Sequence, residues 1–260
     1  MATAITTEKT AWLRKAGDCR IEMPHQPGQA HRSAAGWMID YKIQELTGGE
    51  VRAISTMPDQ FIDKPTFSSP WHYHDCALQV AIVLPGSIEL GYRGGSYARA
   101  IKGDILFIPG KVLHDVSAPS ADYQVAEITF PGTFGTTEAG MPPRDVLTSA
   151  ATLGPSAAER TAVAHGVIEY AYPIAGGLDG RFAIHRLVRS RVDAFEPGER
   201  RHGDAHCLAM VTQGSREVDT GDGPMHADVG DLLVVPGGAS YRDLGYSPDY
   251  EAIEVRLLKG

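Results

Sequence analysis

The sequence predicts an all-β protein built as a sandwich or barrel, on two observations. First, short apolar runs rich in β-branched residues alternate with Gly and Pro, which number 29 and 17 among the 260 residues. Runs of this length, bounded by residues that break regular structure, are typical of strands. The clearest runs are residues 78–84, 104–108 and 231–235. Second, the two halves of the chain carry the same pattern, and the spacing of the runs favours antiparallel strands.

Helices have little room in this pattern. The alanine-rich segment 146–165 is the best helical candidate, but Gly154 and Pro155 interrupt it, and such a pair favours a turn. We therefore expect few short helices, with a partial helix in this segment.

The internal repeat is long and regular. Gly86 in Leu-Pro-Gly-Ser matches Gly214 in Thr-Gln-Gly-Ser at an offset of 128 residues, and residues 102–110 match residues 229–237 at an offset of 127. Solenoid repeats have periods of about 20–50 residues, so this period indicates a duplicated domain. The expected divisions are an N-terminal packing arm (1–35), a first barrel (36–135), a linker with a partial helix (136–180) and a second barrel (181–260).

The composition excludes several classes of partner. The formal net charge is −8, whereas nucleic acids and anionic membrane surfaces both select a basic face. The N-terminal residues lack the apolar core of a secretory signal, and no window approaches the ~20 apolar residues of a membrane span. Cys19, Cys76 and Cys207 are too few and too scattered for a disulfide framework. We therefore expect a reducing, cytoplasmic compartment, in which these thiols act as small apolar residues.

Four residues of the first repeat could close around one metal ion. His72 and His74 are two residues apart, so on a strand they point to the same face. Gln79 lies an odd number of residues from His74, so residues 75–77 must break the strand if Gln79 is to face the same interior. His114 arrives from a later strand. Three imidazoles and one amide oxygen form a donor set that divalent transition metals accept.

These residues fall into two blocks that resemble the two motifs of the cupin superfamily, whose members are small double-sheet β-barrels of jelly-roll type. The first motif reads His-x-His, three or four residues, Glu or Gln, six residues, Gly. The second reads Gly, five residues, Pro-x-Gly, two residues, His. The matching residues are His72, His74, Gln79, Gly86, Gly103, Pro109 and His114. Lys111 departs from the pattern, because the family usually has Gly there. With both repeats, the resemblance covers about three-quarters of the chain and implies two tandem cupin barrels.

The resemblance also implies a metal centre. His72, His74, Gln79 and His114 would bind one divalent transition metal ion (Fe, Mn, Zn or Ni), with one or two coordination positions left open as in catalytic sites. Most cupins have Glu at the position of Gln79. A neutral amide beside three neutral imidazoles leaves the full 2+ charge on the ion, which favours a stronger Lewis acid that resists losing an electron.

Other residues near these motifs have two interpretations each. Glu127 and Thr129 alternate on one face of a predicted strand. If that face points inward, Glu127 is the candidate general base, and if it points outward, Glu127 is a solvated residue. Trp71 and Tyr73 could close the mouth of the site or pack at its rim. Lys111 either contacts an anionic substrate or is a solvated turn residue.

The second repeat does not keep the ligand set. The residues at the positions of His72, His74, Gln79 and His114 are Arg200, His202, Cys207 and Tyr241. One interpretation is a packed barrel that stabilises the first one and a dimer. Another is a metal-free pocket in which Arg200 and Tyr241 bind a carboxylate or hydroxyl. The third is an improvised metal site from His202, His206 and Cys207, in which His206 is one residue off the ligand position and should face the other way.

The sequence thus predicts a metal-dependent enzyme acting on a small oxygenated organic molecule. The resemblance favours a dioxygenase, since that activity is common among two-barrel cupins with one intact site. The alternatives are a non-redox isomerase, cyclase, lyase or hydrolase, which Gln79 favours, and a non-catalytic small-molecule-binding protein. The superfamily hosts all these classes, so the fold cannot choose among them. The expected partners are a small-molecule substrate and a second copy in a homodimer, with no nucleic acid and no membrane.

Overall fold

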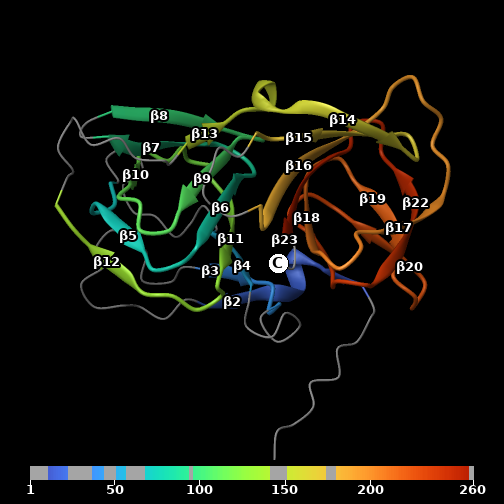
Figure 1. Ribbon diagram of the computed structural model, residues 1–260, viewed down its shortest axis with the longest axis horizontal. Helices are drawn as coiled ribbons and strands as arrows, with labels where there is room; N and C mark the ends of the chain where they lie inside the picture. The colour runs from blue at the N-terminus through green and yellow to red at the C-terminus, as the bar shows by residue number, and fades with distance from the viewer. Residues whose placement is uncertain are drawn as a thin grey trace, which may run out of the picture. The chain divides into compact units, whose positions relative to one another are not determined.

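The computed structural model describes residues 11–22, 37–43, 51–56, 68–93, 96–140, 151–173 and 180–257. Almost all regular structure in these residues is β-strand (Figure 1), which confirms the predicted fold class. The helical structure within the described part consists of two short 3-10 turns, η1 (Ala16–Cys19) and η4 (Pro155–Ala157). No helix in that part is long and apolar enough to cross a membrane. The chain forms two compact units, each of which is described separately below.

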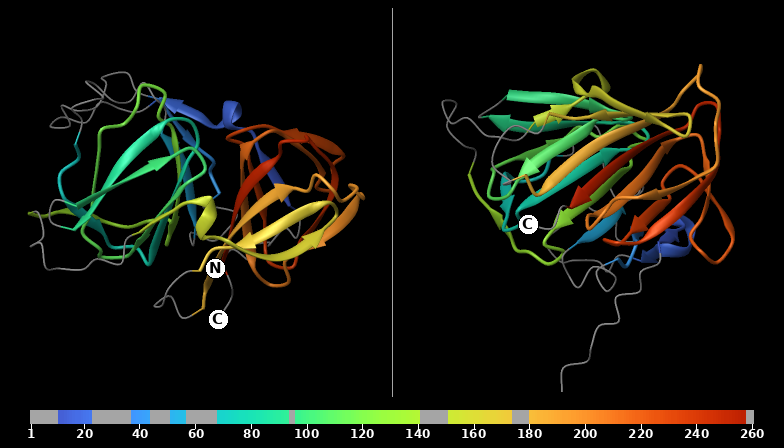
Figure 2. Two further views of the ribbon diagram at one scale, coloured as in Figure 1. Left: turned by 90° about the horizontal axis from the view of Figure 1, so that it is seen from above. Right: turned by 45° about the vertical axis from the view of Figure 1, so that its right-hand side comes forward.

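The unit formed by residues 19–44 and 49–154 is called the first barrel. Its large sheet has seven antiparallel strands in the order β13-β9-β6-β11-β4-β3-β2. A three-stranded sheet, β10-β7-β8, and a strand pair, β12-β5, complete it (Figure 2). The strands are β2 (Arg20–Glu22), β3 (Trp37–Asp40), β4 (Arg52–Thr56), β5 (His72–His74), β6 (Leu78–Val83), β7 (Ser87–Arg93), β8 (Ser96–Ile101), β9 (Ile105–Pro109), β10 (Asp115–Ser117), β11 (Val125–Phe130), β12 (Thr136–Glu138) and β13 (Ala151–Leu153).

The interior of the first barrel lies between its sheets. Strand β6 is buried along its whole length, yet its two faces differ. Ala81 and Val83 pack with Ile88, Leu90 and other apolar side chains contributed by strands of both sheets. Since strand residues two apart share a face, the odd-numbered positions of β6 point into the barrel. This assignment fixes the direction of Gln79.

The remaining residues, 1–18, 45–48 and 155–260, form the unit called the second barrel. Its large sheet has the order β1-β21-β18-β23-β16-β15-β14, and its small sheet has the order β17-β22-β19-β20. Apolar residues of both sheets fill much of the interior, including Cys207, Ala209, Val218 and Leu233. The strands are β1 (Trp12–Arg14), β14 (Glu159–Ala164), β15 (Val167–Ala171), β16 (Phe182–Arg189), β17 (Gly198–Arg201), β18 (His206–Gln213), β19 (Arg216–Asp219), β20 (Pro224–Ala227), β21 (Leu232–Val235), β22 (Ser240–Tyr246) and β23 (Glu251–Leu257).

The two large sheets have matching strand orders, which is how the sequence repeat appears in the structure. The central strands β9, β6 and β11 of the first barrel correspond to β21, β18 and β23 of the second. The turn after β9 and the turn after β21 explain one repeated glycine. A Cβ on Gly110 would lie 1.7 Å from the Cys76 carbonyl oxygen, and a Cβ on Gly237 would lie 2.2 Å from that of Asp204. Only glycine allows this close approach of two backbone segments.

The expectation of a partial helix in residues 146–165 is wrong in the described part of that segment. Residues 151–153 form β13, which pairs with β9, and residues 159–164 form β14, which pairs with β15. Alanine favours helices by less than 1 kcal/mol per residue, so pairing with a neighbouring strand overrides it. Residues 146–150 lie outside the described residues.

The expected arm and linker are divided between the two units. In the N-terminal segment, β1 pairs with β21 of the second barrel and β2 pairs with β3 of the first. In the expected linker, β13 belongs to the first barrel, whereas β14 and β15 belong to the second. Residues 1–10 and 23–35 of the expected arm lie outside the described residues.

Candidate metal centre

Three histidines of the first barrel lie together at the junction of its small sheet and its strand pair. His72 and His74 are the ends of β5, and His114 immediately precedes β10. His72 and His114 pair directly, with backbone N–H to O distances of 2.9 Å in both directions. One ring nitrogen from each of the three histidines lies within 4.8 Å of the others. The structure therefore brings together the three histidines that the motifs select.

The rings of these histidines are held by hydrogen bonds at Nδ1. His72 Nδ1–H donates to the carbonyl oxygen of Pro70 at 2.7 Å, and His114 Nδ1–H donates to that of Val112 at 2.9 Å. A carbonyl only accepts, so in the neutral rings the proton is on Nδ1 and Nε2 carries a lone pair. His74 Nδ1 lies 2.9 Å from the hydroxyl oxygen of Thr136. Such contacts fix the tautomer and orientation of metal-binding imidazoles.

Burial and the neighbouring His72 lower the pKa values of His74 and His114 and keep these two imidazoles neutral. Burial, followed by the charge of His72, lowers the pKa of His74 to about 4. The same two causes, in the same order, lower the pKa of His114 to about 3. The ring of Phe134 packs edge-on against His74 with ring centroids 5.0 Å apart. Neutral imidazoles with free Nε2 lone pairs are the form that binds a metal ion.

Gln79 faces the same interior, as the sequence predicted. Strand β5 ends at His74 and β6 begins at Leu78, so the predicted break at residues 75–77 is confirmed. Gln79 shares its face with Ala81, is 6% exposed, and has a buried Oε1 with no hydrogen-bond partner. Thr129, directly opposite on β11, has a buried hydroxyl that also lacks a partner. An unpaired buried carbonyl oxygen is costly, and coordination to a metal would satisfy it.

Glu127 lies on the inward face of β11. It pairs with Ala81 and is two residues from Val125, and both of these residues belong to the core between the sheets. Its side chain is half-buried. Its carboxylate is not part of the group of ligand atoms within 4.8 Å, so it lies outside the three-histidine cluster itself. The inward orientation is the one that a general base requires, and its catalytic role remains a prediction.

Of the two interpretations given for each, Lys111 fits that of a solvated turn residue and Trp71 fits that of a packing residue. Lys111 is exposed in the turn after β9, and its φ of 61° is in the left-handed region where the family motif has glycine. Its backbone N–H donates to the His74 carbonyl oxygen at 2.9 Å. Trp71 is 8% exposed and is therefore packed.

The equivalent positions of the second barrel line a polar interior. Arg200 pairs across β17 and β22 with Tyr241, which is a core residue. Arg200 forms a buried ion pair with Asp243, and Asp243 also pairs with Arg216. The barrel is therefore not filled by apolar residues alone. His206 is absent from the candidate ligand group of this barrel, as its strand position predicted.

A second group of candidate metal ligands lies in this interior, formed by His202, Cys207 and Glu254. Sequence reasoning selected His202 and Cys207 but missed Glu254, although the repeat offset of 127 that relates Gly103 to Gly230 also relates Glu127 to Glu254. It also missed Thr136, because a contact between residues 62 apart leaves no local pattern.

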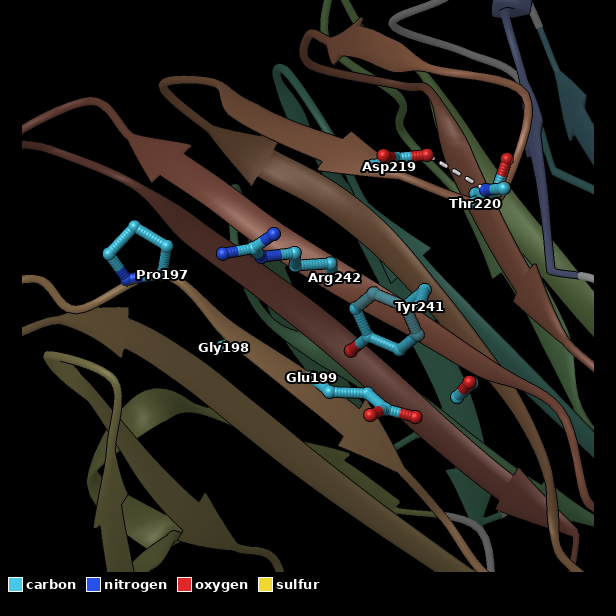
Figure 3. Close-up of a pocket in the computed structure, with 9 residues that line it drawn as sticks. Pro197, Gly198, Glu199, Asp219, Thr220, Tyr241 and Arg242 are labelled. Carbon is cyan, nitrogen blue, oxygen red and sulfur yellow. Dashed lines mark hydrogen bonds between the residues drawn. The ribbon is translucent and has the colours of Figure 1, made fainter.

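Two pockets open in the second barrel. One, of about 480 Å³, is lined by the inward-facing Arg200, His202 and Arg256 together with Glu169. The other, of about 600 Å³, is shown in Figure 3. There Glu199 and Arg242 lie opposite each other on β17 and β22. Both are one residue from an inward-facing neighbour and are exposed, so this second pocket lies on the outside of the sheet.

Known structures with the same architecture include enzymes and a storage-type globulin. Salicylate 1,2-dioxygenase from Pseudoaminobacter salicylatoxidans, in an adduct with gentisate, matches with a TM-score of 0.66 at 14% identity, over 96% of this chain and 82% of that chain. Bacillus subtilis oxalate decarboxylase, whose Mn(II) centres are described, matches with a TM-score of 0.63 at 13% identity, over 98% and 78%. An 11S globulin from Wrightia tinctoria, with an auxin-binding site, matches with a TM-score of 0.66 at 12% identity, over 98% and 85%.

No family model and no curated protein sequence matches this chain. The structural matches extend over both units and share the paired β-barrels. Together with the strand orders and the two motif blocks, they show that the chain has the two-barrel cupin fold.

Proposed function

We propose that the first barrel binds one divalent transition metal ion through His72, His74, His114 and Gln79 and uses it to act on a small oxygenated organic molecule. The observation that carries this proposal is the state of the three histidines. Each ring is fixed at Nδ1, and the ring nitrogens gather within 4.8 Å. A packing role would not require three imidazoles with their remaining nitrogens turned toward one another.

The donor set fits a catalytic ion better than a structural one. Three imidazoles and one amide leave one or two positions open for substrate. When bound, the ion would orient a hydroxyl or keto oxygen of the substrate and stabilise negative charge that develops on it. Oxalate decarboxylase, whose Mn(II) centres are described, and salicylate 1,2-dioxygenase match the two-barrel fold of this chain, which supports a metal-dependent enzyme.

The side chains around the ion would divide the remaining work. Glu127 faces the interior from β11 and would accept a proton from the substrate. Thr129 offers a buried hydroxyl without a partner beside Gln79 and would hydrogen-bond the substrate or its water. Phe134 packs against His74 and keeps that side of the site apolar. A dioxygenase is the reaction that we propose first, in which substrate and O₂ would bind in adjacent positions.

A non-redox reaction is the second candidate, because of the chemistry of Gln79. Its amide is neutral, and the pKa values of His74 and His114 are lowered. The protein thus supplies no negative charge from these ligands, which favours an isomerase, cyclase, lyase or hydrolase that stabilises an enolate. A third candidate is a non-catalytic binding protein, as the auxin-binding globulin illustrates.

Oxygen consumption separates the first two candidates. The protein is purified, its metal content is measured, and it is screened with small hydroxy and keto acids, both aromatic and aliphatic, in air and under anaerobic conditions. Uptake of O₂ in proportion to product supports the dioxygenase. A reaction that proceeds unchanged without O₂ eliminates it and supports the non-redox candidate.

The matched control is His114→Ala, which removes the most buried imidazole of the cluster. Activity that survives in this variant, or wild-type protein that holds no more metal than the variant, would contradict the proposed site.

The cellular setting belongs to the same proposal. Cys19, Cys76 and Cys207 are buried and form no disulfide, which fits a reducing, cytoplasmic compartment. A homodimer is the assembly that we propose, and its mass in solution is the test.

A further inference from the structure

We propose that the second barrel contains its own metal site, formed by His202, Cys207 and Glu254 and chemically distinct from the site in the first barrel. The ligand atoms of these three residues lie within 4.8 Å of one another. They come from three places in the barrel: Cys207 from β18, Glu254 from β23, and His202 from the segment after β17.

The strand register explains why the three side chains meet. Cys207 belongs to the core between the sheets, and Ala209, two residues further along β18, is paired with Glu254. Cys207 and Glu254 therefore share the inward face. His202 is two residues beyond Arg200, whose strand partner Tyr241 is also in the core. These strand positions bring the three side chains together in the interior of the second barrel.

The separation of the ligand atoms suits a bound ion better than a hydrogen bond. His202 Nε2 lies 3.8 Å from Glu254 Oε2, which is too far for a hydrogen bond. Around a tetrahedral zinc ion with bonds of about 2.0–2.2 Å, nitrogen and oxygen ligands are roughly 3.3–3.5 Å apart. A contraction of a few tenths of an ångström would therefore complete the site.

Two of the three ligand atoms, His202 Nε2 and Glu254 Oε2, are buried without hydrogen-bond partners, whereas the Cys207 thiol hydrogen-bonds Glu254. The His202 side chain is 7% exposed, that of Glu254 is 0% exposed, and neither Nε2 nor Oε2 makes a hydrogen bond. The two oxygens of Glu254 have separate roles. Arg256 Nε donates to Oε1 at 2.6 Å, which leaves Oε2 turned toward His202. A buried carboxylate oxygen and a buried imidazole nitrogen without partners are costly unless something binds them.

The charges around the cluster can accommodate a 2+ ion. Arg256 also bonds Glu169 through both terminal nitrogens, at 3.3 and 3.0 Å, so its charge is shared with a second carboxylate. Burial raises the pKa of the Cys207 thiol, so a bound ion would displace the thiol proton to solvent. The resulting thiolate and the carboxylate of Glu254 would neutralise the ion. His202 and Arg256 also line the pocket of about 480 Å³, which gives an entry path and room for a fourth ligand.

The donor set predicts which metals bind. A thiolate, an imidazole and a carboxylate select a borderline or soft ion such as Zn²⁺ rather than Mn²⁺ or Mg²⁺. The first barrel offers nitrogen and amide oxygen donors only. The two barrels would therefore select different metals despite their common strand order.

Cobalt titration tests this inference, because Co²⁺ substitutes for Zn²⁺ and thiolate coordination gives it a ligand-to-metal charge-transfer band in the near ultraviolet. We expect the apoprotein to bind two Co²⁺ ions per chain and to show this band. Cys207→Ser should remove the band and lower the capacity to one ion. His114→Ala should keep the band and also lower the capacity to one.

Controls separate folding from ligation. Cys76→Ser removes a buried thiol of the first barrel, outside both ligand groups, and should leave the band intact. His202→Gln changes a residue that lines the pocket and provides a second test if Cys207→Ser does not fold. Cobalt affinity at this site should fall by at least about 100-fold in either variant.

Several outcomes would overturn the second site. The second site is ruled out if wild-type protein shows no charge-transfer band at two equivalents of Co²⁺. It is also ruled out if the band persists in folded Cys207→Ser protein. Binding of one ion, lost in His114→Ala, would leave the first barrel as the metal centre and remove the second. These results do not depend on turnover, so they are independent of the proposed activity.

Discussion

The two barrels share a strand order and differ at three of the four positions of the metal motif. His72, His74, Gln79 and His114 in one barrel correspond to Arg200, His202, Cys207 and Tyr241 in the other. The first barrel has neutral imidazoles above an apolar core. The second has a buried network of charges in the same region. The fold therefore does not need the imidazoles, and their presence in the first barrel requires a chemical explanation.

The shared features are those that the backbone requires. The close approach at Gly110 recurs at Gly237. Asp104 and Asp231 are both buried after a glycine with positive φ, Gly103 and Gly230. Such positions constrain the path of the chain whatever the interior contains.

The largest expected effect comes from removing a ligand of the first barrel. His114→Ala should lower its metal affinity by more than the roughly 10–100-fold typical of losing a supporting hydrogen bond, because one of three converging nitrogens is gone. Elemental analysis after dialysis measures this. His226→Ala, at an exposed histidine of the second barrel, should leave the metal content unchanged. Equal metal content in both variants would remove the distinction between the barrels.

Loss of one charged partner in the buried network of the second barrel should strongly lower the free energy of unfolding. Asp243 is 0% exposed and pairs with both Arg200 and Arg216, and Arg216 is itself 1% exposed. Asp243→Asn leaves two buried guanidinium groups without their carboxylate and should cost about 3–5 kcal/mol. Urea unfolding measures the loss of free energy, and Asp222→Asn at an exposed site is the control. A cost below about 1 kcal/mol would show that solvent reaches the network.

Support of the histidine rings is a finer difference between the barrels. Thr136→Val removes the hydroxyl that contacts His74 Nδ1 and should lower the metal affinity of the first barrel by about 10–100-fold. Thr137→Val is matched in size and position, but Thr137 pairs with Tyr73 and faces the other way. Competition with a chelator measures both. A similar loss in the two variants would mean that β12 acts through folding.

Acid should destabilise the metal-free protein through the same histidines. The pKa of His74 is about 4 and that of His114 about 3 in the folded chain, whereas an unfolded histidine titrates near ~6.5. As the pH falls, the unfolded chain therefore takes up protons before the folded chain does. The contribution of these histidines to stability is complete above pH ~6.5 and is lost as the pH falls toward the pKa values of the folded chain. The free energy of unfolding, measured at several pH values, should decrease as the pH is lowered through this range. The dependence of this free energy on pH should be weaker in His114→Asn. An unchanged slope would contradict the burial of this ring.

The smallest effect concerns the turn after β9. Lys111 has a φ of 61°, and its counterpart Gly238 has a φ of 85°. Lys111→Gly removes a left-handed strain and should stabilise the protein by about 0.5–1 kcal/mol, after the added flexibility of glycine in the unfolded chain is included. Gly238→Lys should do the reverse. Thermal unfolding of the two variants tests the pair, and destabilisation by Lys111→Gly would instead indicate that the lysine side chain makes a contact.

The features that depend on local pattern could be predicted from the sequence. The spacing of His72, His74 and Gln79 and the break between β5 and β6 follow from the two-residue period of a strand. The duplication follows from matched glycines. The strand spacing and the break are short-range properties that can be predicted from neighbouring residues, and the duplication is visible because the same local pattern occurs twice in the chain.

The features that join distant segments could not be predicted from local pattern and depend on the tertiary structure. It placed β1 on β21, turned an alanine-rich segment into strands, pointed Glu127 inward and brought Glu254 to His202 and Cys207. Each depends on which strand lies beside which, and that is set by the burial of whole sheets. Weak local preferences do not determine such pairings.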